Sequence, residues 1–248
     1  MSSEKNFNPY QPEYVSLFEA LYGQHLMSLG GINAIENMFS DIHLACLTAL
    51  DVGFGIGGVA FYLAKKYKMQ VFGVEMYSWM AQYAEEHAPK ELADQLHFKR
   101  YGEEEKIPFS AKKFDLVYSK GVLNHVSNKI PLFQQIHSCL KDKGHLVIAD
   151  WIYPKAYHCM KGPLVKETED SYRFVLNASG FDSIEFRDDS EQFEIYVLSF
   201  LDNLDLQRVF ISEHFGEKVF LSIRSDHLKL LENIRHKDKI AVRILIKK

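Results

Sequence analysis

The residues best suited to chemistry lie between Leu47 and Gly58, where an apolar run ends in an acid and is followed by glycines. Asp51 closes the apolar run, and glycines stand at positions 53, 55, 57 and 58. Glycine permits positive φ and removes the side chains that keep a ligand away from backbone N–H groups at a helix start. The pattern therefore predicts a strand-to-helix turn that receives a ligand.

A second acid extends this site, because Glu75 ends the next apolar run. A carboxylate can accept hydrogen bonds from both hydroxyls of a ribose, so Glu75 predicts a binding site for a nucleoside. The spacing of Gly53, Gly55 and Gly58 also fits the dinucleotide fingerprint G-x-G-x-x-G, which leaves a nicotinamide cofactor open. Asp51, however, occupies a position that is usually apolar in dinucleotide-binding strands.

The segment before these strands carries a further ligand signal. Ser28, Gly30 and Gly31 precede an expected helix over residues Ile32–Phe39. A serine and two glycines before a helix form a cap, and they also form a concave set of N–H groups that suits an anion. Capping alone explains the pattern equally well.

Together these motifs resemble class I S-adenosylmethionine-dependent methyltransferases. They look most like the phosphoethanolamine (phosphobase) methyltransferases, with the sarcosine and dimethylglycine N-methyltransferases close behind. The resemblance rests on Tyr10, the run Phe18–Gly23, Ser28-x-Gly30-Gly31, the glycine loop after Asp51, and Tyr118-Ser119-Lys120 followed by His125. It covers most of the chain and is weak in the C-terminal part.

The resemblance implies that Tyr10 and His125 face each other across the methyl donor, with Tyr10 closing the site and His125 as general base. It also implies that Asp51 helps to order the glycine loop and reaches the amino-acid end of the cofactor. It further implies a cofactor-binding set from the N-terminal segment, the glycine loop and the strand ends. That set is Tyr10, Met27, Ser28, Gly30, Asp51, Gly53, Gly55, Glu75, Met76, Gly102, Glu103 and Lys120. Lys120 stands where the family often has arginine, so it would meet the cofactor carboxylate without a bidentate fork.

The expected acceptor site departs from the family pattern. Gly121 stands where the family has an aspartate near the substrate ammonium, and Trp151 replaces a tyrosine. We expect both to border the substrate, with the Trp151 indole facing a cationic amine, although a core tryptophan explains it equally well. The residues expected to hold a phosphate align with Gly162 and Leu164. Phosphoethanolamine is therefore not carried over as the substrate.

The expected reaction is methylation of a small molecule, and N-methylation of a small amine by in-line displacement is the leading hypothesis. Positioning alone supplies roughly 7–11 kcal/mol in such reactions. An amine as basic as lysine needs a base at neutral pH, and His125 suits that role, with capping of a turn as its structural alternative. O-methylation of a metabolite, a nicotinamide-dependent oxidoreductase and a cofactor-binding protein without turnover remain open.

Alternating apolar segments predict the frame that positions these residues. Strands are expected at Leu47–Val52, Met69–Glu75, His97–Arg100, Phe114–Ser119, His145–Trp151, Asp182–Arg187 and Ile240–Lys247. Helices are expected after the first two strands, at Pro131–Leu140 with a stop at Lys143-Gly144, and at Glu167–Ser179. Such βα repeats predict an α/β, doubly wound, Rossmann-like sheet of seven mostly parallel strands, with ligands at their carboxyl ends.

The chain is expected to form a single domain, because its 248 residues and 47% hydrophobic content suffice for one full core. Within it we expect an N-terminal helical lid (1–40), a cofactor-binding core (41–188), a helical insert (189–238) and a final strand (239–248). The lid and the insert would cover the carboxyl ends of the strands.

Charge and cysteine content limit the partners. The formal net charge of −4 argues against nucleic acid or an anionic membrane as a partner, and leaves a small-molecule methyl acceptor. Cys46, Cys139 and Cys159 are widely spaced, which favours free thiols in the cytoplasm. No metal site is expected, because the nearest approach to a ligand pair, His158-Cys159, has nothing to complete it. No membrane segment or leader is expected either.

Overall fold

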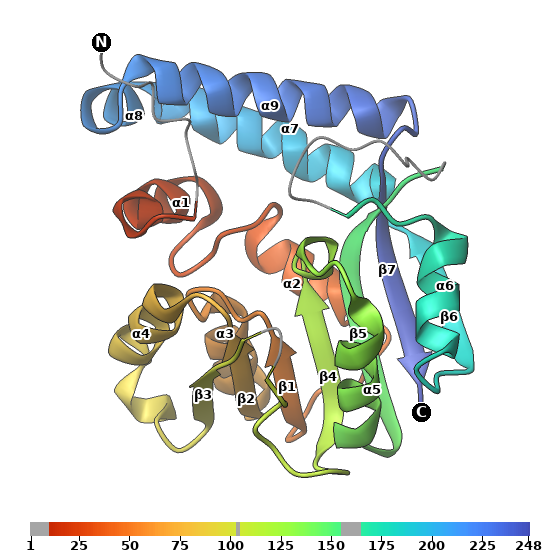
Figure 1. Ribbon diagram of the computed structural model, residues 1–248. Helices are drawn as coiled ribbons and strands as arrows, with labels where there is room; N and C mark the ends of the chain where they lie inside the picture. Colours follow the sequence, from red (N-terminus) through yellow and green to blue (C-terminus); the bar gives the residue numbers. More distant parts are fainter. Residues whose placement is uncertain (1–9, 103–104, 155–164) are drawn as a thin grey trace.

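The computed structural model describes residues 10–102, 105–154 and 165–248, and its centre is a seven-stranded sheet (Figure 1). The strands are β1 (Thr48–Val52), β2 (Gln70–Glu75), β3 (Leu96–Arg100), β4 (Phe114–Lys120), β5 (Leu140–Ile152), β6 (Ser183–Asp188) and β7 (Ile240–Lys247). Their order is β3-β2-β1-β4-β5-β7-β6. β1 to β5 run parallel, and β7 lies antiparallel between β5 and β6. The predicted fold class is confirmed.

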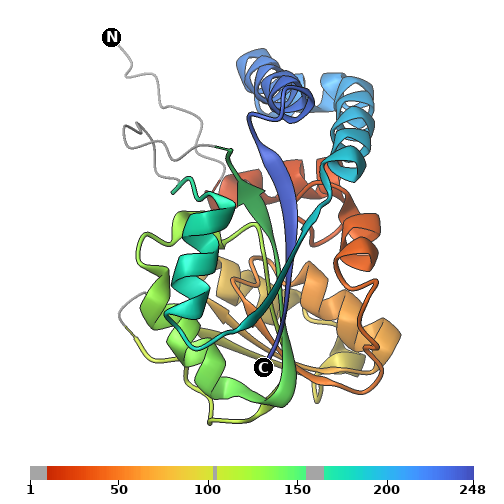
Figure 2. The same cartoon turned by 90° about the vertical axis from the view of Figure 1, so that its right-hand side faces the viewer.

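Helices cover both faces of this sheet, with α5 and α6 on one side and α2 and α3 on the other (Figure 2). The helices are α1 (Val15–Tyr22), α2 (Gly31–Met38), α3 (Gly58–Tyr67), α4 (Ser78–His87), α5 (Lys129–Cys139), α6 (Glu169–Asn177), α7 (Ser190–Leu206), α8 (Arg208–His214) and α9 (Glu217–Arg235). Short 3-10 turns occur at Pro12–Tyr14, Lys90–Leu92 and Leu123–His125.

The two layers follow from the alternation of side chains along buried strands. Leu50 and Val117 belong to the core that includes α5 and α6. Their sequence neighbours Ala49 and Leu116 belong to the core that includes α2 and α3. Successive side chains of a strand point to opposite faces, so a strand covered on both sides must be apolar throughout.

The N-terminal helices and the insert pack on each other above the carboxyl edge of the sheet (Figures 1 and 2). Leu17 and Leu21 of α1 share an apolar cluster with Val197 and Phe200 of α7 and with Phe220 of α9. The insert therefore supports the N-terminal segment, which in turn faces the ends of β1, β2 and β4.

The start of β5 differs from the sequence prediction. The strand was expected from His145 after a helix stop at Lys143-Gly144, but α5 ends one residue before β5 begins at Leu140. Phe114 pairs with Leu140 whereas Leu116 pairs with His145, so β5 carries extra residues in between. Lys143 lies there with φ +68. The stop signal was wrong because it marks a bulge inside the strand rather than the end of the helix.

The end of β5 leads to α6, which starts two residues later than expected. Thr168 caps it, since its Oγ1 accepts a hydrogen bond from the Ser171 N–H at 3.0 Å and the Ser171 Oγ accepts one from the Thr168 N–H at 2.9 Å. This reciprocal pair satisfies two N–H groups that a helix start would leave unpaired. The cap therefore fixes where the helix begins.

Within the described ranges, no helix combines the length and the apolar character needed to cross a membrane. The same residues hold no group of three or more His, Cys, Asp or Glu side chains arranged to bind a metal ion. Cys46 is exposed and Cys139 is buried, and both are free thiols. Cys159 and its neighbour His158 lie outside the described residues.

Candidate active site

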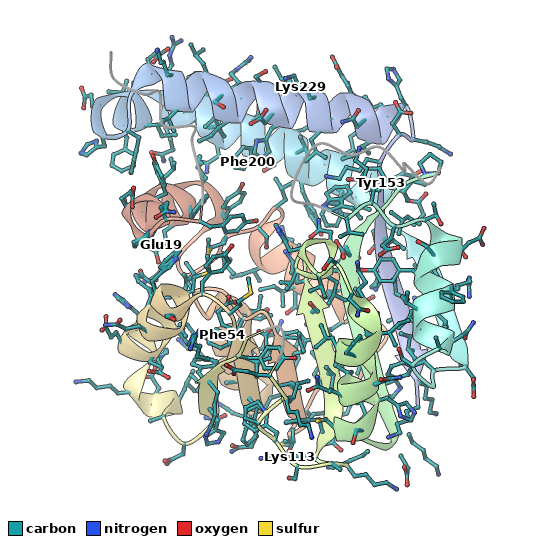
Figure 3. All side chains as sticks on the ribbon, viewed as in Figure 1. Glu19, Phe54, Lys113, Tyr153, Phe200 and Lys229 are labelled. Carbon is teal, nitrogen blue, oxygen red and sulfur yellow. The ribbon has the colours of Figure 1, made fainter. Side chains whose placement is uncertain are left out.

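A cavity of about 230 Å³ opens at the carboxyl ends of β1, β2 and β4. The order of strands along the sheet reverses between β1 and β4, and open α/β sheets bind ligands at such a point. The lining comes mainly from residues 51–56 and 58 around the glycine loop, 25–28 before α2, 74–77 after β2 and 120–122 after β4. Phe54 marks the glycine loop in Figure 3. Tyr10 and His125 also line the cavity.

Asp51 stands near the end of β1 and is 3% exposed. Its Oδ2 has no hydrogen-bond partner among the described residues. Burial raises the pKa of the carboxyl to about 8, and the Tyr118 hydroxyl beside it opposes this only in part. A buried carboxyl oxygen without a partner costs free energy until a donor reaches it. Asp51 therefore suits an N–H donor that arrives with a ligand, and a cationic donor would lower the pKa of the carboxyl and favour its ionised form.

Glu75 fixes the glycine loop from the end of β2. Its Oε2 accepts a hydrogen bond from the Gly55 N–H at 2.9 Å, and its Oε1 accepts one from the Tyr77 N–H at 2.9 Å. Burial raises the pKa of this carboxyl, against the effect of these backbone donors. Each oxygen retains a lone pair for a further donor. Among the described residues, the carboxylate that orders the loop is thus Glu75 rather than Asp51.

Gly53 shows that the loop also needs glycine for packing. Its φ is +83, and a Cβ at this position would lie 2.5 Å from Val122 on the segment after β4. Its N–H donates to the Val74 carbonyl at 2.8 Å. Any side chain here would push the segment after β4 away from the loop, and the cavity lies between the two.

Lys120 brings a buried positive charge to the same cavity. Its Nζ donates a hydrogen bond to the Ser28 hydroxyl and a long one, 3.5 Å, to the Leu29 carbonyl. It forms no ion pair with any residue that the structure describes. Burial lowers its pKa to about 8, so the ammonium form prevails at neutral pH. An anionic ligand group would supply the missing counter-charge.

Tyr10 and His125 are in direct contact at the cavity. The Tyr10 hydroxyl lies 3.2 Å from His125 Nε2, and the two rings meet edge to face with centroids 5.5 Å apart. Tyr10 also stacks on Tyr77, with centroids 5.8 Å apart and an interplanar angle of 4°. Burial lowers the pKa of His125 and raises that of Tyr10. The His125 imidazole at the cavity is therefore neutral, and the Tyr10 ring packs against it.

Comparison with known proteins shows the family to which this chain belongs. The model of a family described as a methyltransferase domain matches residues 45–194, which is more than half of the chain. The chain belongs to the methyltransferase family. This membership confirms the predicted resemblance, the enzyme class and S-adenosylmethionine as the cofactor, and it decides against the nicotinamide interpretation of the glycine spacing.

Three relatives illustrate the likeness. The methyltransferase is 26% identical to phosphoethanolamine N-methyltransferase of Plasmodium falciparum, over 96% of its own length and 93% of the relative. It is 28% identical to glycine/sarcosine/dimethylglycine N-methyltransferase of Actinopolyspora halophila, over 68% of its own length and 31% of the relative. Its fold matches phosphoethanolamine N-methyltransferase 2 of Haemonchus contortus with a TM-score of 0.84 at 20% identity, covering 96% of this chain and 58% of that one. It thus spans most of the first relative and less than two thirds of the other two.

The cavity of the methyltransferase fits S-adenosylmethionine. The unpaired Oδ2 of Asp51 suits the ammonium of the methionine part, and the buried Lys120 cation suits its carboxylate. The Glu75 carboxylate stands at the end of β2, where a ribose is bound in related sheets. Met27 and Met76 line the cavity as well and offer apolar contact.

Two predicted cofactor residues lie outside the cavity lining, and one cannot be placed. Gly30 takes φ +81 before α2, and a Cβ there would lie 2.6 Å from the Tyr196 ring of α7. Packing against the insert therefore accounts for this glycine. Gly102 follows β3 but does not reach the cavity, and Glu103 lies outside the described residues.

Trp151, predicted to border the substrate, also lies outside the cavity lining. Its ring meets Phe193 of the insert with centroids 5.1 Å apart, and the Lys239 Nζ lies 4.3 Å from its centroid. The cation over this indole therefore comes from the chain itself. Gly162 and Leu164, which align with the phosphate-holding positions, lie outside the described residues.

Several lining residues were missed by the sequence analysis. His25 and Tyr77 are examples, together with Leu26, Phe54, Ile56, Met80, Tyr101, Val126 and Leu132. Most are apolar and carry no motif of their own. Tyr77 could have been found, because it directly follows Met76 and Glu75 at a strand end where ligand contacts gather.

Proposed function

We propose that this methyltransferase transfers a methyl group to the nitrogen of a small amine. The observation that carries the proposal is the Tyr10–His125 pair, a hydroxyl and an imidazole 3.2 Å apart at the cavity. The relatives whose names specify phosphoethanolamine and glycine, sarcosine and dimethylglycine support an amine as acceptor. S-adenosylmethionine supplies the methyl group on a positively charged sulfur.

His125 is the proposed general base. An alkylammonium acceptor must lose a proton before its nitrogen lone pair can attack, and a neutral imidazole can take that proton. Burial lowers the pKa of His125, so its ring is neutral and able to do so at physiological pH. The Tyr10 hydroxyl lies 3.2 Å from Nε2 and fixes the orientation of the ring, and Nδ1 takes the proton when the Nε2–H donates to Tyr10.

Tyr10 and Gly121 would shape the acceptor side of the cavity. Tyr10, stacked on Tyr77, covers the site and excludes water from the reacting atoms. Gly121 lines the cavity with φ +70, and no heavy atom of a described residue lies within 4 Å of the place where a Cβ would stand. The absence of a side chain here, in the cavity that His125 also lines, supports a small acceptor on this side.

The proposed base predicts a pH profile. We expect kcat/KM to rise with pH on the acid side and to level off above the pKa of His125, which lies below its ordinary value of 6.5. Protonated His125 cannot accept the acceptor proton, so activity falls as pH drops through this pKa. An acceptor with an ammonium pKa of about 10 stays protonated over this pH range, so its own ionisation does not change the pH profile.

The profile is measured with one amine between about pH 5 and pH 8. Tyr10→Phe serves as the control and should retain the acid limb, because burial raises the pKa of Tyr10 away from this range. An activity that stays constant down to the lowest pH would contradict His125 as the base.

An acceptor screen tests the proposed function itself. Purified protein is incubated with S-adenosylmethionine and panels of amines, amino acids, phosphobases and hydroxylated metabolites, and S-adenosylhomocysteine is quantified. We expect turnover with at least one small amine, with the added methyl on nitrogen by mass spectrometry and NMR. A methyl found only on oxygen, or S-adenosylhomocysteine that never exceeds background, would overturn the proposal.

A further inference from the structure

The Glu19 side chain of α1 joins three parts of the molecule that are separate in sequence. Its Oε1 accepts a hydrogen bond from the His25 backbone N–H at 3.0 Å and one from the Tyr83 hydroxyl of α4 at 3.1 Å. The His25 Nδ1 lies 3.2 Å from the same oxygen. Figure 3 shows Glu19 between α1 and α4. We refer to Glu19, His25 and Tyr83 as the Glu19 hub.

The hub holds a segment that forms one wall of the cofactor cavity. Residues 25–28 line that cavity, and Ser28 accepts the hydrogen bond from Lys120. The His25 carbonyl packs directly on the first residue of α3, since a Cβ on Gly58 would lie 2.1 Å from its oxygen. A shift of His25 would therefore move both the wall of the cavity and its contact with the glycine loop.

His25 needs such support because its backbone is in an unfavourable conformation. Its φ is +59, in the left-handed region that is unfavourable for a residue other than glycine. The Glu19 oxygen binds its N–H, and its ring meets Phe61 of α3 edge to face at 5.4 Å. Burial, and to a smaller extent the charge of Glu19, raises the pKa of Tyr83 to about 12, so its hydroxyl stays protonated and remains a hydrogen-bond donor.

We propose that Glu19 is a positioning residue for the cofactor, which keeps segment 25–28 in its binding conformation through the Glu19 hub. A ligand that binds one conformer of a segment has an apparent Kd divided by the populated fraction of that conformer. Loss of Glu19 lowers that fraction, weakens cofactor binding and leaves the acceptor side at Tyr10 and His125 in place. The inference rests on S-adenosylmethionine as cofactor and not on the identity of the acceptor.

The test compares two carboxylates of the N-terminal region. In Glu19→Ala we expect the Kd of S-adenosylhomocysteine, measured by calorimetry, to rise about tenfold, as for loss of a hydrogen bond to a charged group. At saturating S-adenosylmethionine, kcat and the acceptor KM should remain close to wild type. Glu19→Gln should restore binding in large part, because its amide oxygen can still accept from His25 and Tyr83.

Glu36→Ala is the matched control. Glu36 of α2 accepts hydrogen bonds from Tyr62 and Tyr67 and pairs with Lys66, all on α3, but none of these residues lines the cavity. It should lower the melting temperature at least as much as Glu19→Ala while leaving the Kd of S-adenosylhomocysteine unchanged. An equal rise in Kd for both variants would mean general destabilisation and would overturn the inference.

Tyr83→Phe removes a single hydroxyl of the hub and keeps the test decisive if Glu19→Ala does not fold. We expect a smaller rise in Kd, of about threefold, with an unchanged melting profile. Wild-type affinity in a folded Glu19→Ala, or in Tyr83→Phe when Glu19→Ala is unfolded, would overturn the role of Glu19. Absence of S-adenosylhomocysteine binding by the wild type would instead remove the cofactor assignment on which the proposed function rests.

Discussion

Replacement of His125 by alanine is expected to lower kcat by about 10²–10⁴-fold, the usual contribution of a general base. The Kd of S-adenosylhomocysteine should change by less than about twofold, since a base acts on the transition state rather than on cofactor binding. Its ring makes a polar contact with Tyr10, whereas Asp51, Glu75 and Lys120 are the lining residues that we assign to the cofactor. Steady-state kinetics with the best amine and calorimetry with S-adenosylhomocysteine measure the two effects.

His137→Ala provides a matched control for this experiment. His137 is also half-buried with a pKa lowered by burial, but its ring packs edge to face on Phe181 at 5.0 Å and does not line the cavity. Its loss should leave kcat unchanged. Added imidazole should restore part of the turnover of His125→Ala and none of that of His137→Ala. A parallel loss of turnover and of cofactor affinity in His125→Ala would assign His125 a structural role instead.

The sheet could be predicted because each strand obeys a local rule. Strands buried on both faces must be apolar, as Leu50 and Ala49 of β1 illustrate, and the acids Asp51 and Glu75 mark where two of them reach the cavity. The carboxyl ends of parallel strands meet at one edge, so the order of the motifs sufficed to bring them together. The bulge at Lys143 was not predictable, because it arises from the register of β5 on β4.

Contacts between distant segments explain the other differences. The signal at Ser28, Gly30 and Gly31 left a helix cap and an anion site open, yet Gly30 is required by the Tyr196 ring, which comes from the insert far along the chain. Trp151 was expected to face a cationic substrate, but Lys239 fills that place. No local sequence pattern predicts that Tyr196 or Lys239 makes these contacts. Both residues belong to elements whose position is set only by the complete fold.

The hydrogen bonds of the glycine loop also depend on the folded backbone. Asp51 and Glu75 are both carboxylates at strand ends, and the resemblance implied that Asp51 helps to order the glycine loop. The direction of the Gly55 N–H decides this, and it points to Glu75. Asp51 keeps an oxygen to which no described residue donates a hydrogen bond, which makes it the better candidate for a charged ligand group. Which of the two carboxylates binds the loop therefore depends on the backbone dihedral angles of the loop. Glycine allows many such angles, so the sequence alone does not determine them.

Replacement of Lys120 by methionine is expected to raise the Kd of S-adenosylhomocysteine by about 10²-fold, the effect of removing one partner of a buried charge pair. Methionine keeps much of the volume of lysine and removes only the ammonium that would meet the ligand carboxylate. Lys120→Arg should lose less affinity for S-adenosylhomocysteine, because a guanidinium retains the positive charge. Calorimetry or a fluorescent displacement assay measures these affinities.

Methylthioadenosine separates the charge of Lys120 from its structural contacts. This ligand has the same nucleoside but lacks the amino and carboxyl groups, so its affinity should be equal in wild type and Lys120→Met. Lys141→Met is the control variant, because Lys141 pairs with Asp115 away from the cavity and should leave both ligands unaffected. An equal weakening of both ligands in Lys120→Met would show that Lys120 acts through its hydrogen bond to Ser28, by holding the cavity wall, and not by binding the carboxylate.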